Sequence, residues 1–167
     1  GTYLVKLSTQ AANEADSAEA AGLLKIIGDL ERISDHAVNL VEAAEEIAEK
    51  GIQLTPAAAK ELEVICSAVG QVVTFACDAF VQNDTSIAMR VEPLEEVVDD
   101  LKEELRSRHI LRLQRSMCSI EAGFVWSDIL TGLERTSDHC SNVAVSVLDM
   151  AQHNMNQHEF LRNVRND

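Results

Sequence analysis

GDLERISDHAVNL at residues 28–40 returns as TGLERTSDHCSNV at residues 131–143. Seven of the thirteen aligned positions are identical, and these are Leu, Glu, Arg, Ser, Asp, His and Asn. An internal repeat usually marks one structural unit per copy, so we expect two related units. Around each copy the apolar residues recur every three or four positions, which predicts an amphipathic helix.

Each copy of the repeat carries two carboxylates and an amide at helical spacing. Glu31, Asp35 and Asn39 are four residues apart, so they form one stripe on a helix. The second copy has Glu134 and Asp138, followed by the matching Asn. Carboxylates one turn apart repel each other, and oxygen ligands suit a hard or borderline cation, so these pairs are candidate metal ligands. The alternative is a solvated helix face that happens to recur.

Two further kinds of residue bear on such a site. Glu95 and Asp99 form a third carboxylate pair with the same spacing. His36 and His139 directly follow the Asp of each copy, so on a helix they diverge from it by about 100°. We therefore expect the histidines to pack or to support the site, and not to bind the same ion.

Composition indicates a helical bundle and excludes some partners. The chain has 167 residues, 4% aromatic residues and two prolines, which suits long helices in an all-α fold. The formal net charge is −14, and no basic stripe is present to neutralise phosphates. We therefore expect neither nucleic acid nor an anionic membrane surface as a direct electrostatic partner.

Start and stop signals place the helices. Asp16 and Glu19 form a capping box that is expected to begin the first long helix, and Gly51 is its stop signal. Thr55, followed by Pro, is a start signal. Pro93 is expected either to kink its helix or to mark a fresh start. We predict helices over residues 2–13, 16–50, 56–82, 86–116 and 120–156.

Apolar residues predict which faces are buried. The seam of the first long helix consists of Leu23, Ile26, Ile27, Leu30, Ile33, Ala37, Leu40, Val41, Ala44, Ile47 and Ala48. The seam of the last helix consists of Ile120, Phe124, Leu130, Leu133, Cys140, Val143, Ala144, Val147, Leu148 and Ala151. We also assign Trp126 to the core. Residues 64–81 are interpreted as a buried amphipathic helix that is too polar to span a membrane.

The cysteines fit a reducing compartment. Cys66, Cys77, Cys118 and Cys140 form no Cys-x-x-Cys pair and no zinc-finger spacing with histidine. Cys66 and Cys77 are eleven residues apart on one helical face, where small buried hydrophobic residues are expected. We therefore expect four reduced thiols and a cytoplasmic location.

The repeat also carries a family resemblance. LERISDHAVNL, at residues 30–40, strongly resembles the signature helix of PhoU-like proteins, which regulate phosphate uptake. Three other segments resemble the PhoU-like domain at the C-terminal end of bacterial sodium/phosphate cotransporters, namely residues 3–8, 128–131 and 137–142. The resemblance covers nearly the whole chain. It implies two repeated three-helix bundles, and it implies that Glu/Asp-x-x-x-Asp motifs hold metal clusters.

The resemblance implies how the chain is divided. We expect one PhoU-like domain over residues 1–167, with a truncated first repeat over about 1–52 and a second repeat over about 55–160. In such domains each bundle sets one acidic helix against one signature helix. The first repeat largely lacks its acidic helix, which leaves an apolar seam exposed, so we expect a homodimer.

In the second repeat both helices are present. If they pack antiparallel with their acidic turns level, four carboxylates converge, namely Glu95, Asp99, Glu134 and Asp138. Such a cluster is expected to bind cations or to have raised pKa values. Iron, zinc, manganese and magnesium stay open as the metal. The first-repeat pair, Glu31 and Asp35, would need a partner helix from elsewhere.

The leading functional hypothesis is a regulatory domain of phosphate transport, similar to the cytoplasmic part of a sodium/phosphate cotransporter attached to the inner membrane. Its expected partner is the membrane domain of the same full-length protein, or a phosphate-signalling protein. Metal binding would bias one conformation without turnover, so no enzymatic activity is expected.

Two alternatives stay open. One is a metal-free scaffold that binds a partner helix. The other is a di-metal carboxylate enzyme, although the Glu-x-x-His pairs of such enzymes are absent.

Overall fold

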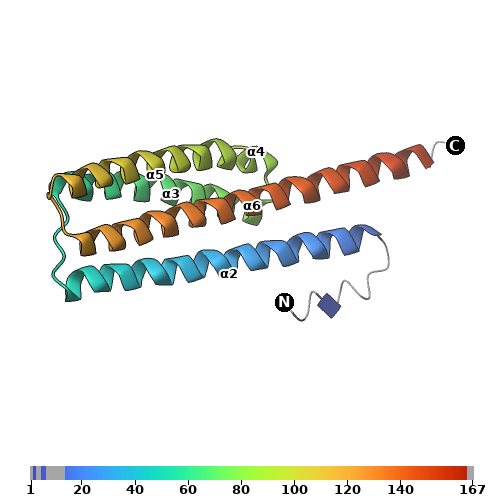
Figure 1. Ribbon diagram of the computed structural model, residues 1–167. Coiled ribbons are helices and arrows are strands. Elements are labelled where there is room, and N and C mark those ends of the chain that lie inside the picture. Colours follow the sequence, from blue (N-terminus) through green and yellow to red (C-terminus); the bar gives the residue numbers. More distant parts are fainter. Residues whose placement is uncertain (1, 3–4, 7–13, 165–167) are drawn as a thin grey trace.

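The computed structural model describes residues 2, 5, 6 and 14–164, which form helices and no strand. The expected all-α bundle of long helices is therefore confirmed, while most of the expected helix over 2–13 lies outside the described residues. The helices are α2 (Glu14–Glu49), α3 (Pro56–Gln82), α4 (Thr85–Ala88), α5 (Val91–Gln114) and α6 (Ile120–Val164). Figure 1 shows the four long helices lying side by side, with short connections at both ends.

Most helix ends lie where local signals put them. Gly51 adopts φ +61° directly after α2, a conformation that glycine tolerates best. Thr55 Oγ1 accepts a hydrogen bond from Ala58 N at 3.2 Å and caps α3. Pro93 lies in the first turn of α5, so it marks a fresh start and no kink.

The capping-box prediction was wrong, since α2 begins at Glu14 and places Asp16 inside its first turn. The last helix also extends beyond the predicted end at residue 156.

A three-helix bundle of α3, α5 and α6 contains the main core, and α2 lies along α6. Within the described residues α2 has no comparable packing against α3, α4 or α5. The largest fully buried side chains come from all four long helices and include Trp126, Ile26, Ile65, Val72, Val98 and Val147. The division into a truncated and a complete repeat stays a prediction.

The predicted seam of α2 was partly wrong. Ile26 is fully buried, and Leu30, Ile33, Leu40 and Ile47 pack against the core, as expected. The exposed members are Ala37, Val41, Ala44 and Ala48, and Ala43 packs inward instead. The reason is that α6 is the one helix that packs along α2 within the described residues, so only a narrow stripe of the apolar face of α2 is covered.

The predicted seam of α6 was wrong at its beginning. Phe124 is 70% exposed and Ile120 is 75% exposed, whereas Trp126 is buried as predicted. The inward positions near this end belong to Ala122, Val125 and Ile129. Which side of α6 is buried at this end depends on where α3 and α5 pack against it. The sequence of α6 alone does not specify those positions.

The four cysteines are free thiols, as predicted, but the predicted burial of Cys66 and Cys77 was wrong. Cys66 and Cys77 are exposed, because the buried stripe of α3 runs through neighbouring positions such as Ile65 and Ala76. Cys140 on α6 is buried, and burial, followed by the nearby Cys77, raises the pKa of its thiol to about 12.

The helix α3 is long and apolar enough to cross a membrane by length and composition alone. In its most apolar stretch of 18 residues, 28% is buried in the protein. We predicted from the sequence that residues 64–81 are too polar to span a membrane. By length and composition alone, that prediction was wrong. In this structure the helix packs its buried side, including Val69 and Val72, against α5 and α6.

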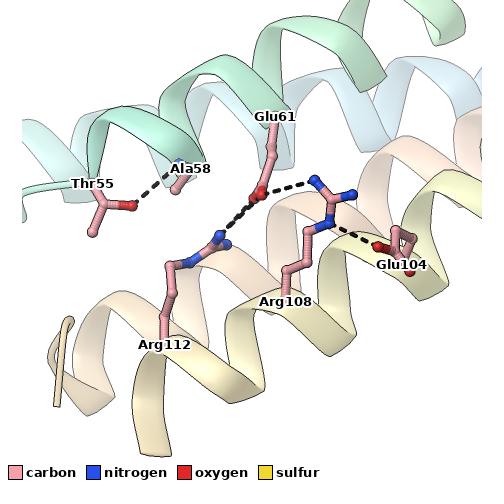
Figure 2. A network of polar contacts seen from close by, with 6 residues as sticks. All are labelled: Thr55, Ala58, Glu61, Glu104, Arg108 and Arg112. Carbon is pink, nitrogen blue, oxygen red and sulfur yellow. Dashed lines mark hydrogen bonds and ion pairs between the residues drawn. The ribbon is translucent and has the colours of Figure 1, made fainter. Parts of the chain in front are cut away.

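An ion-pair network links α3 to α5 near the α5–α6 turn (Figure 2). Glu61 on α3 faces two guanidinium groups of α5, with its carboxylate 2.8 Å from Arg112 Nη1 and 3.6 Å from Arg108 Nη1. Arg108 Nε also lies 2.8 Å from Glu104 Oε1. Arg112 stacks over the Trp126 ring at 5.5 Å from its centroid, so the network is joined to the core.

Candidate metal site

The helices α5 and α6 bring three predicted carboxylates together. Glu95 and Asp99 lie one turn apart on α5, and Asp138 lies on α6. One oxygen from each of the three lies within 4.8 Å of the other two. Oxygen ligands at about 2.0–2.6 Å from one Mg²⁺ or Ca²⁺ are no more than about 5 Å apart, so this spacing fits a shared cation.

Burial and crowding of negative charge raise the pKa values of two carboxyl groups in this cluster. Burial, followed by the charges of Asp99 and Asp138, raises the pKa of Glu95 to about 7. Burial, followed by the charges of Glu134 and Asp99, also raises the pKa of Asp138. A proton between Glu95 and Asp138 relieves part of this repulsion. A divalent cation would relieve it more strongly and would displace that proton.

The fourth predicted carboxylate has a different partner. Lys102 Nζ on α5 donates a hydrogen bond to Glu134 Oε1 at 2.7 Å. Both side chains are largely buried, with 21% of Lys102 and 18% of Glu134 exposed. Glu134 therefore stays close enough to act electrostatically on Asp138, while its own charge is neutralised by the lysine.

The first-repeat pair lies elsewhere. Glu31 and Asp35 are exposed on α2. In the part of the chain that the structure describes, neither belongs to a group of three potential ligands, unlike the α5–α6 cluster. The structure therefore does not gather these two residues with the others, and their role as ligands stays a prediction.

A polar cluster between α2 and α6 was not identified from the sequence. Asp29 Oδ1 lies 2.9 Å from His139 Nδ1 and accepts a hydrogen bond from Asn142 Nδ2 at 3.4 Å. The rings of His139 and His36 stack with centroids 5.7 Å apart, so both histidines pack as expected. One signal in the sequence could have revealed this cluster. Asp29 is the one acidic residue of the first copy that the second copy lacks, since Gly132 stands at the aligned position.

The cluster on α5 and α6 also has support from neighbouring groups. Glu92, one turn before Glu95, accepts a hydrogen bond from Ser141 Oγ at 2.5 Å. This contact fixes the start of α5 against α6 just beyond the carboxylates. A cation held here would be bound by oxygen atoms alone, with three protein carboxylates as candidate ligands.

Comparison with known proteins agrees with this arrangement of helices. A family model described as the PhoU domain matches residues 2–44 and 62–147, which is most of the chain. The chain belongs to the PhoU family. The resemblance of residues 28–40 to the signature helix is thereby confirmed at the level of the family.

Relatives within the PhoU family have known names. The chain is 32% identical over 142 residues to the phosphate-specific transport system accessory protein PhoU homolog 1 of Thermotoga maritima, covering 85% of this chain and 60% of that protein. It is 32% identical over 127 residues to the PhoU homolog of Pseudomonas aeruginosa, covering 74% of this chain and 50% of that protein. The chain thus spans half to about 60% of the length of these two relatives.

The fold has a solved counterpart. The crystal structure of PhoU from Pseudomonas aeruginosa superimposes with a TM-score of 0.80 at 26% sequence identity. The match covers 89% of this chain and 71% of the other. The helical arrangement of the described residues is therefore that of a PhoU protein.

Proposed function

We propose that the chain acts as an accessory, non-enzymatic regulator of phosphate transport, and that a metal ion fixes α5 against α6. The family supports the first part, since its named relatives are accessory proteins of phosphate-specific transport systems. The observation that carries the second part is the meeting of Glu95, Asp99 and Asp138 within 4.8 Å.

The metal would act through packing. The cation supplies positive charge that lets three carboxylates remain ionised side by side. Glu95 and Asp99 would hold it from α5, and Asp138 would hold it from α6. The ion would then stabilise one arrangement of the two helices, and a partner that contacts this arrangement would respond to it. Iron, zinc, manganese and magnesium all remain candidates.

The proposal also includes where the chain is located and which proteins it contacts. We place the chain in the cytoplasm, next to the membrane part of a phosphate transporter or beside a phosphate-signalling protein. The version in which it is the C-terminal domain of a sodium/phosphate cotransporter, attached to the inner membrane, rests on the resemblance of residues 3–8, 128–131 and 137–142. A homodimer is supported by the exposed apolar residues of α2, Val38 and Val41.

A metal-free scaffold is the second candidate. Lys102 already neutralises Glu134, and the raised pKa of Glu95 lets a proton occupy the cluster near neutral pH. The same residues would then hold the helices together without a cation, and the function would depend only on the surface that a partner contacts.

Elemental analysis separates the two candidates, and the repeat provides a matched control. The protein is dialysed against trace iron, manganese, zinc and magnesium, beside a Glu95→Gln/Asp138→Asn variant and a Glu31→Gln/Asp35→Asn variant. We expect bound metal in the wild type and in the α2 variant, and loss of at least one ion in the α5–α6 variant. No metal in any of the three proteins would leave the metal-free scaffold. Equal metal content in all three would show that metal binds outside the α5–α6 cluster, and would overturn the proposed site.

A further inference from the structure

The two copies of the repeat face each other across an approximate twofold axis. His36 on α2 and His139 on α6 occupy aligned positions, and their rings stack at 5.7 Å with an angle of 22°. The two helices run antiparallel, as Figure 1 shows, with residues near 22 packed against residues near 150. Each contact on one side of the histidines therefore has an expected counterpart on the other side.

On one side of this axis a carboxylate fills the interface. Asp29 Oδ1 lies 2.9 Å from His139 Nδ1 and accepts a hydrogen bond from Asn142 Nδ2. The side chains of Asp29 and His139 are 17% and 24% exposed. Together with the exposed Asn142 they form a small polar cluster at the edge of the interface.

On the other side the carboxylate is missing. The residue aligned with Asp29 is Gly132, whereas His36 and Asn39 correspond to His139 and Asn142. A cavity of about 390 Å³ lies here, lined among others by His36, Asn39, Gly132 and Arg135. A Cβ at Gly132 would meet only Leu40, at an ordinary 3.5 Å, so packing does not forbid a side chain at this position.

The remaining wall of the cavity is acidic. Glu42 and Glu46 line it from α2, and Asp128 lines it from α6. Lys50 neutralises Glu46 at 2.7 Å, while Glu42 and Asp128 are exposed. A bare anion would meet these carboxylates, whereas a molecule with opposite charges at its two ends would match both parts of the wall.

We propose that this cavity binds a small zwitterion, whose carboxylate takes the place beside His36 and Asn39 that Asp29 takes beside His139 and Asn142. Arg135 pairs with the same carboxylate, and the distant ammonium group lies toward Glu42 and Asp128. The volume is in the range of small-molecule sites. The site lies between α2 and α6, apart from the carboxylate cluster between α5 and α6, so the two can be tested separately.

The test uses ligands that differ in one charged group. NMR titrations of the labelled protein are carried out with 5-aminopentanoate, acetate and 1-aminopentane. We expect 5-aminopentanoate to shift the resonances of His36, Asn39 and Arg135, with an affinity about tenfold higher than that of acetate or 1-aminopentane. Equal binding of 1-aminopentane would show that the acidic wall alone attracts the ligand, and would overturn the proposal.

Two variants give the decisive comparison. Gly132→Asp supplies the missing carboxylate within the chain, so we expect it to weaken 5-aminopentanoate binding by about tenfold or more. Asp29→Gly opens the matching space beside His139 and Asn142, but Val145 and Lys25 occupy the positions aligned with Glu42 and Asp128. We therefore expect a second site that takes a carboxylate and binds acetate at least as tightly as 5-aminopentanoate. Helicity measured by circular dichroism checks folding, and if Gly132→Asp does not fold, Asp29→Gly decides alone. Unchanged binding in a folded Gly132→Asp variant, or no second acetate site with Asp29→Gly, would overturn the proposal.

Discussion

At the scale of single residues, Lys102 determines how many carboxylates face the space between α5 and α6. It holds Glu134 at 2.7 Å, and this leaves Glu95, Asp99 and Asp138 as the group that shares one small volume. The spacing in the sequence predicted the two carboxylate pairs, and the family resemblance predicted that the helices carrying them would meet. Neither predicted the lysine contact, because that contact depends on the longitudinal register of α5 against α6, which no local signal encodes.

The first prediction concerns Lys102→Met. Removing the ammonium group leaves the largely buried Glu134 without its partner, so we expect the metal-free protein to lose about 1–3 kcal/mol of stability. Urea unfolding in the presence of a chelator measures this loss. Glu134→Gln is the matched control, because it keeps a polar side chain and removes the charge, and it should cost less. A Lys102→Met variant as stable as the wild type would contradict the role assigned to this pair.

The second prediction concerns pH. The folded pKa of Glu95, at about 7, exceeds its unfolded value of 4.5, so the folded state binds more protons between these values. In the metal-free protein, the contribution of Glu95 to the free energy of unfolding should therefore be fully present below about pH 4.5. It should be lost as the pH rises to about 7. We expect a decrease of about 1–3 kcal/mol, since partial exposure reduces the full effect.

Unfolding in urea at pH 5 and pH 7.5, with a chelator present, measures this decrease. Glu95→Gln should flatten the dependence. The raised pKa of Asp138 acts in the same direction, so some dependence remains in that variant. Stability that rises with pH over this range, in the wild type but not in Glu95→Gln, would show that the carboxylate is not crowded as described.

At the scale of helices, most ends followed local chemistry, with the start of α2 as an exception, and the buried faces followed the apolar pattern only in part. Gly51 and Thr55 act through their own backbone conformation and side chain, so their effect could be predicted without knowing the fold. Phe124 and Val41 were assigned to buried seams, yet both are exposed. Which face of an amphipathic helix is covered depends on the number and placement of its neighbours, and among the described helices α2 packs against α6 alone.

The third prediction concerns the start of α3. Thr55 Oγ1 accepts from Ala58 N, so Thr55→Ala should lower the free energy of unfolding by about 1 kcal/mol. Thr55→Ser is the control, because serine keeps the accepting oxygen and should cost much less. Thermal unfolding of the three proteins measures both effects, and equal losses in the two variants would show that the hydroxyl does not stabilise the helix start.

At the scale of the whole molecule, α2 is the least covered long helix. Its only packing partner in the described residues is α6, and Val38 and Val41 are 56% and 59% exposed. The chain also spans half to about 60% of the length of its two named relatives. Val38 and Val41 are therefore a candidate contact for a second polypeptide.

The fourth prediction concerns this surface. If a second copy covers it, a Val38→Lys/Val41→Lys variant should be monomeric at concentrations where the wild type dimerises, because two buried ammonium groups are costly. Sedimentation equilibrium measures the association. Val145→Lys is the control, since Val145 is 48% exposed on α6 and its replacement should leave the dimer intact. A wild type that is monomeric at all accessible concentrations would contradict the homodimer.

One measurement asks directly whether a cation fixes α5 against α6. Amide hydrogen exchange is followed in α5, with and without Mn²⁺, for the wild type, Asp138→Asn and Asp35→Asn, whose altered residues are aligned in the repeat. We expect Mn²⁺ to slow exchange around residues 95–102 by about tenfold in the wild type and in Asp35→Asn, and to have no effect in Asp138→Asn. No slowing in the wild type, or equal slowing in Asp138→Asn, would contradict the metal-set packing of the two helices.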